Sequence, residues 1–142
     1  MWEKQRNLLI ALGVFAGLAV LLIGWFVTRP VHYGSPTARQ WDQLRTATAS
    51  ITFANGALAR CNYDRLSDDI DPATAEAELR EFTNRYDLSE AQKQILSTGS
   101  NASTSLSLSL TEGGVSGEMC FNAQQLINGV VKKIRSGELA QG

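Results

Sequence analysis

The hydrophobic positions of the chain begin as one unbroken run and become periodic only later. Residues 8–27, LLIALGVFAGLAVLLIGWFV, contain no charged side chain. Twenty helical residues reach about 30 Å, the thickness of a hydrocarbon core. The run is longer than the roughly 7–15 apolar residues of a signal peptide, and no small-x-small cleavage site follows it. It therefore predicts a transmembrane helix over residues 8–28, preceded by a cytoplasmic tail at residues 1–7.

The ends and one face of this run carry the first candidate functional residues. Trp2 and Trp25 flank it, as aromatic residues do at a membrane interface. Gly13, Gly17 and Gly24 recur at gaps of four and seven, which places them on one helical face. Small residues let two helix backbones approach closely in lipid, although glycine is also common there by chance. The face is predicted to pack on transmembrane helices of other subunits, and it would also serve a homodimer.

Helical spacing returns after a short linker. Residues 29–36 contain two prolines and a glycine, which disfavour a continuous helix. From residue 36 the apolar and small positions recur at gaps of three and four, so a long helix is expected over residues 36–66 with Ser35 as its N-cap. The positions in this stripe are Trp41, Leu44, Ala47, Ile51, Ala54, Leu58 and Cys61.

Two further helices have recognisable starts. Asp71 is suited to cap the first, and Pro72 is suited to its first turn. Its apolar face consists of Ala75, Leu79, Phe82 and Tyr86. Ser89 and Gln92 have the spacing of a capping box, which predicts a short third helix over LSEAQKQIL.

The period then changes from 3.6 to 2. TSLSLSL places Leu106, Leu108 and Leu110 on one side and serines on the other, the pattern of a half-buried strand. A turn signal, TEGG, and a second alternating run, VSGEMCF, complete a predicted β-hairpin. A last helix is expected from an Asn122 cap to Gly137. The expected fold class is therefore α+β: one transmembrane helix, about three helices, a β-hairpin and a C-terminal helix, with the domain at residues 37–137 and a tail at 138–142.

The two cysteines give information about the cellular compartment of the domain. Cys61 and Cys120 have no C-x-x-C neighbour, and His32 is the only histidine. A zinc site normally needs four ligands, so a metal role is not expected. In an oxidising compartment the pair would form a disulfide, with two buried free thiols as the alternative. The bridge and the short N-terminal tail together favour a domain outside the cytoplasm, the periplasm if the source is bacterial.

The charge distribution and the lack of known motifs argue against several classes of function. A formal net charge of −1 with scattered basic residues gives no footprint for nucleic acid. The acidic residues at 64, 68, 69 and 71 lack the spacing of a calcium-binding loop. No hydrolase, metalloprotease or phosphate-loop motif occurs, so no catalytic, cofactor-binding or metal-binding residue is assigned.

These patterns favour an interaction protein over an enzyme. The chain is predicted to be a non-catalytic, single-pass accessory subunit in the bacterial inner membrane, in contact with the lipid bilayer. It would dock on a larger membrane complex through Gly13, Gly17 and Gly24 and stabilise or regulate that complex from the periplasmic side. The alternative is a membrane-tethered periplasmic binding or chaperone-like module that acts without a stable complex.

Overall fold

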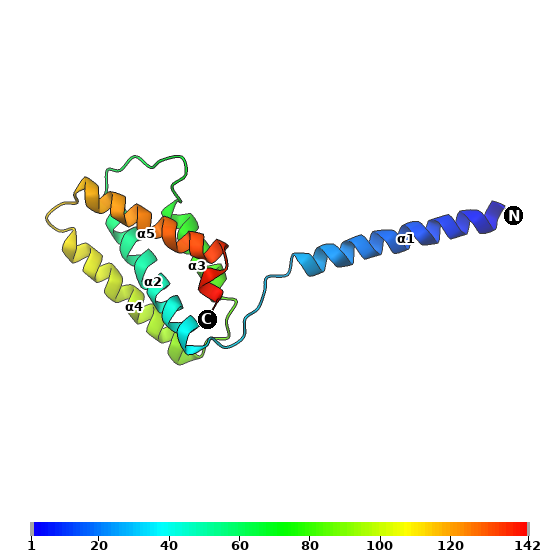
Figure 1. Ribbon diagram of the computed structural model, residues 1–142, viewed down its shortest axis with the longest axis horizontal. Helices are drawn as coiled ribbons and strands as arrows, with labels where there is room; N and C mark the ends of the chain where they lie inside the picture. The colour runs from blue at the N-terminus through cyan, green and yellow to red at the C-terminus, as the bar shows by residue number, and fades with distance from the viewer. Residues whose placement is uncertain (1, 142) are drawn as a thin grey trace. The chain divides into compact units, whose positions relative to one another are not determined.

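In the computed structural model, the chain forms helices that belong to two compact units, residues 1–31 and 32–142 (Figure 1). It describes residues 2–141, except for the side chains at positions 2, 4, 6–9, 11 and 12. The elements are α1 (Trp2–Val27), α2 (Ala38–Leu58), α3 (Pro72–Thr83), α4 (Glu90–Leu110), α5 (Gly117–Arg135) and a 3-10 turn, η1 (Glu138–Ala140).

The first unit requires a correction of the predicted transmembrane helix at residues 8–28. Within the described residues, no helix combines the length and the apolarity that crossing a membrane demands. α1 is helical over Trp2–Val27.

α2 is the central helix of the second unit. α3, α4 and α5 each pack against it, and α3 also packs against α5 (Figure 1). Among the described residues, α4 packs along α2 alone. The buried cluster lies where α2, α3 and α5 meet and includes Leu44, Ile51, Phe82, Ile127 and Val131. The apolar faces predicted for the helix after Pro72 and for most of the stripe in α2 are confirmed as core.

The helix starts follow from local capping. Asp71 caps α3 by accepting from the N–H groups of Ala73 and Thr74, as predicted. Ser89 begins α4 with the predicted capping box. The predicted Ser35 cap is wrong, because Thr37 forms a complete capping box with Gln40 and begins α2 two residues later.

α2 also ends earlier than predicted, at Leu58, so the expected helix over residues 36–66 is too long. The apolar stripe extends to Cys61 because the disulfide, and not a continuing helix, holds that residue against the domain.

The predicted α+β class and its β-hairpin are wrong. Residues 2–141 contain no strand, only an isolated bridge between Gly34 and Tyr86. TSLSLSL continues α4, in which Ser107 is buried while Leu106, Leu108 and Leu110 are exposed. VSGEMCF contains the start of α5, capped by Ser116 in place of the predicted Asn122. Small serines face α2 at this point because the two helices approach too closely for leucines.

Candidate functional site

A row of hollows follows the side of α2 that faces away from α3. α4 and α5 flank this side without packing against each other, within the described residues, and leave what is called here the outer groove. It contains three hollows of about 490, 180 and 430 Å³. Its floor is a stripe of α2 residues at helical spacing, Asp42, Thr46, Ala49 and Phe53.

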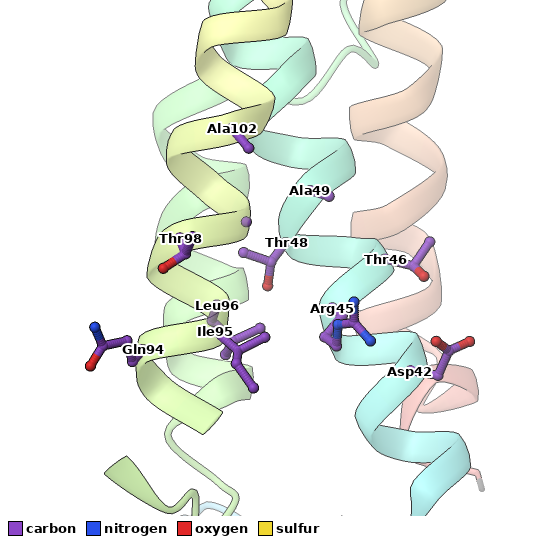
Figure 2. Close-up of a pocket in the computed structure, with 11 residues that line it drawn as sticks. Asp42, Arg45, Thr46, Thr48, Ala49, Gln94, Ile95, Leu96, Thr98 and Ala102 are labelled. Carbon is purple, nitrogen blue, oxygen red and sulfur yellow. The ribbon is translucent and has the colours of Figure 1, made fainter. Parts of the chain in front are cut away.

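The end of the outer groove between α2 and α4 is the 490 Å³ hollow in Figure 2. The Ile95 side chain points into the space between the two helices, near Arg45 of α2. Ile95 keeps 47% of its surface exposed. Arg45 makes no ion pair with any described residue. The hollow therefore offers an apolar wall and a cation that have no partner in this part of the chain.

A second groove, of about 630 Å³, lies on the other side of α4, between α3 and α4. Its walls are mainly hydroxyl and amide side chains over an apolar floor of Ile51, Leu79 and Leu96. Thr52 and Ser100 hydrogen-bond across α2 and α4 at 3.0 Å. The buried Asn55 Oδ1 has no hydrogen-bond partner among the described residues. The lining also includes the exposed charged residues Glu76 and Arg80, whose side chains lie 3.9 Å apart.

The connection between α2 and α3, residues 59–71, is held at both ends. Cys61 and Cys120 lie at disulfide distance, with their Cα atoms 5.9 Å apart. At the other end, the Asn128 amide of α5 accepts from the Ile70 N–H at 2.9 Å and donates to Asp69 Oδ1 at 2.8 Å. Between these clamps the loop presents Leu66, which is 59% exposed.

The Asp69 carboxylate is the electrostatic centre of this clamp. Besides Asn128, the Leu66 N–H and the Tyr63 hydroxyl donate to it, at 2.8 and 3.2 Å. The hydrogen bond from Asn128, followed by the other donors and nearby Arg65, holds the pKa of Asp69 below its ordinary value of 3.8. Partial desolvation raises the pKa of the Tyr63 hydroxyl, and the contact with Asp69 raises it further.

The lowered Asp69 pKa leads to a pH prediction. A carboxyl whose folded pKa is depressed stabilises the protein above its unfolded pKa, and that stabilisation disappears as the pH falls through the folded value. The free energy of unfolding should therefore decrease between about pH 5 and about pH 2, and Asp69→Asn should make this decrease shallower. Urea denaturation across this range measures both effects.

The control for Asp69→Asn is Asp64→Asn, because Asp64 is an exposed aspartate of the same loop. It should leave the stability at pH 7 unchanged. An equally steep acid loss in Asp69→Asn and in the parent would contradict the role assigned to this carboxylate.

The predicted helix-packing residues all lie on α1. A Cβ built at Gly13, Gly17 or Gly24 meets nothing within 4 Å. Trp25 is 55% exposed, and the guanidinium of Arg29 lies 3.6 Å from the centre of its ring. The Trp2 side chain falls outside the described residues. The roles predicted for these residues, packing and membrane interface, stay predictions.

Two of the four aspartates in the 59–71 loop, Asp69 and Asp71, accept hydrogen bonds. Asp71 caps α3 and pairs with Arg65, whose hydrogen bond lowers the pKa of that carboxyl. Among the described residues, no group of three or more His, Cys, Asp or Glu side chains is placed to hold a metal ion.

Sequence reasoning missed the outer groove, because it assigned half of α4 to a strand. The available signal was the spacing of Ile95, Leu106 and Leu110 on one helical face, which becomes visible only when the whole segment is helical. No protein-family model, curated protein or solved structure matches the chain.

Proposed function

We propose that the protein is a non-catalytic accessory subunit that docks through α1 on apolar helices of a larger membrane protein complex. Its disulfide-bonded helical domain then stabilises or regulates that complex from the periplasmic side. The observation that carries the proposal is the exposed apolar surface of α1, since a large exposed patch of this kind marks an interaction surface.

The side chains of α1 support docking in two ways. Phe15, Leu21 and Phe26 are 74, 72 and 69% exposed, although each is a residue type that is usually buried. On the same helix, the three glycines leave the backbone uncovered for close approach. A partner helix at the glycine face would gain backbone contacts that larger residues there would prevent.

The cysteine pair supports the proposed periplasmic location of the domain. Disulfides persist outside the cytoplasm and are rare within it. Cys61 and Cys120 lie at bonding distance, and they tie the loop at residues 59–71 to the first turns of α5. A domain clamped in this way suits a compartment without the glutathione and thioredoxin systems that keep thiols reduced.

The test is a pair of substitutions on the glycine face. Gly13→Ile together with Gly17→Ile should reduce co-purifying partner proteins at least tenfold after gentle detergent extraction, as measured by quantitative mass spectrometry. Isoleucine has a higher helix propensity than glycine, so the helix itself is preserved. The loss would come from the bulk placed between two helix backbones.

Ala19→Ile is the matched control, because Ala19 is exposed on the opposite side of α1. It should keep the partners. Equal recovery of partners by Gly13→Ile/Gly17→Ile and by the parent would overturn docking through this face. That result would favour an independently acting binding module, for which the 630 Å³ hydroxyl-lined groove is the available site.

A further inference from the structure

α4 carries two stripes of side chains along its length, and only one of them is covered. The covered stripe consists of small or medium residues against α2: Leu96, Ser100, Ser103 and Ser107. The second stripe lies beside it and is exposed: Ala91, Ile95, Gly99, Ala102, Leu106 and Leu110. We refer to this second set as the α4 stripe. Three of its members, Ile95, Gly99 and Ala102, line the outer groove.

The exposure of the α4 stripe is unusual for its composition. Ile95, Leu106 and Leu110 are 47, 55 and 56% exposed. Apolar side chains scattered singly over a surface need no explanation, but these three recur along about 22 Å of one helix face. A contiguous apolar stripe beside an open groove is the pattern of a surface that another helix covers.

The spacing of the α4 stripe identifies what would cover it. Its gaps are four, four, three, four and four residues, so it reads the same in both directions about a centre between Ser100 and Asn101. When two copies of α4 run antiparallel about this centre, Ile95 lies opposite Leu106 of the other copy, and Gly99 lies opposite Ala102. Small residues then meet where the helices approach most closely, and large residues meet on both sides of that point.

We infer that the α4 stripe is the interface of a two-fold symmetric homodimer, in which α4 of each copy lies antiparallel to the other along the outer groove. A two-fold interface requires a self-complementary patch, and the palindromic spacing of the stripe supplies one. Ile95 then meets Leu106 and Gly99 meets Ala102, while Ala91 at one end meets Leu110 at the other. The occupant of the groove is therefore a second copy of this chain.

Charges at the ends of α4 agree with the antiparallel arrangement. The helix ends with carbonyl groups that carry partial negative charge, and exposed Glu112 follows them. The antiparallel partner brings these groups beside the amino end of the other α4. That is the end of the groove where Arg45 stands without an ion-pair partner among the described residues.

The size of the contact indicates a dimer that dissociates on dilution. A strip about 28 Å long and about 10 Å wide covers about 300 Å² on each copy before the α2 wall is counted. Transient interfaces are of this scale, below about 1,200 Å² in total, and obligate dimers bury more. Association should therefore depend on protein concentration.

A series of substitutions that introduce charges into the α4 stripe tests the antiparallel pairing of α4 in the full chain. Sedimentation velocity of the detergent-solubilised protein over a hundredfold concentration range should show a monomer–dimer equilibrium for the parent. Leu106→Glu should weaken dimerisation at least tenfold. Ile95→Lys/Leu106→Glu should recover most of it, because each lysine then faces a glutamate of the other copy. Within one helix these two positions are about 16 Å apart and cannot pair.

The control for the series is Leu108→Glu, because Leu108 is 43% exposed on a different face of α4. It should dimerise as the parent does. The α1 sequence is unchanged in every variant, so any association through α1 contributes equally to all of them. A monomeric parent, an unaffected Leu106→Glu, or a double variant no better than Leu106→Glu would each overturn the inference.

Cross-linking provides a test that does not depend on destabilising the interface. About the proposed centre, two copies of residue 102 are offset by about 5 Å along the helix axis, and two copies of residue 108 by about 22 Å. Ala102→Cys should therefore be cross-linked efficiently by a bismaleimide that spans about 8 Å, and Leu108→Cys should not. Equal cross-linking of both variants, or of neither, would refute the antiparallel register.

Discussion

Replacing both members of the Cys61–Cys120 pair by alanine is expected to lower the free energy of unfolding by about 4 kcal/mol. The bridge closes a loop with a sequence separation of 59 residues, and this loop contains all of α3 and α4 and the first residues of α5. A closed loop of this length restricts the unfolded chain, and the chain-entropy model gives about 4 kcal/mol for it.

Removing the bridge should also loosen one segment, the 59–71 loop, in addition to lowering the stability of the whole domain. Cys120 is 3% exposed in the first turns of α5, while the connection that contains Cys61 has little regular structure. Without the bridge, the Asn128 network at residues 69–70 is the remaining clamp on the 59–71 loop. Proteolysis should therefore begin at residues 62–68 in the alanine variant and not in the parent.

Equilibrium urea denaturation measures the effect, with dithiothreitol as an internal control. The reductant should destabilise the parent by nearly as much as the double substitution does. It should leave Cys61→Ala/Cys120→Ala unchanged. A parent insensitive to reductant would mean that the pair contributes only packing.

The elements that were predicted correctly have starts and faces defined by neighbouring residues. Asp71 and Pro72 fix the first turn of α3, and Leu79 and Phe82 then follow at helical spacing into the core. Such signals are local: the cap forms within three residues, and the apolar face requires only some apolar partner.

α4 was mispredicted because its contacts reverse the usual preference. The alternation of serine and leucine from residue 104 to 110 has the period of a half-buried strand, and apolar residues are normally assigned to the inside. Here Ser107 is fully buried and Leu106 is exposed. Ser107 can be buried because α2 approaches α4 closely at Gly56, about fifty residues earlier in the chain.

The candidate site, like the fold, was predicted only in part from the sequence. The sequence identified exposed glycines on α1 but not the outer groove, since the groove is formed by α2, α4 and α5 together. The symmetry of the α4 stripe was present in the sequence throughout. It acquires meaning only when residues 90–110 are known to be one helix with a single covered face.

The close approach of α2 and α4 rests on Gly56, and Gly56→Leu is expected to destabilise the domain by about 1–3 kcal/mol. A Cβ built on Gly56 meets Ser107 Cβ at 3.0 Å and Ser107 Oγ at 2.6 Å. The hydroxyl can rotate, but the Cβ moves only if the helix moves. Because α4 packs along α2 alone among the described residues, it has no second contact that would hold it while α2 is pushed away.

Gly129→Leu is the matched control, because a Cβ at Gly129 in α5 meets nothing within 4 Å. There the same substitution removes a flexible residue from a helix and should stabilise the protein by about 0.5–1 kcal/mol. The two variants should therefore shift the urea midpoint in opposite directions, and Gly56→Leu should also lose helical circular dichroism. If both were stabilising, α4 would tolerate displacement from α2, and the covered stripe of serines would not determine its position.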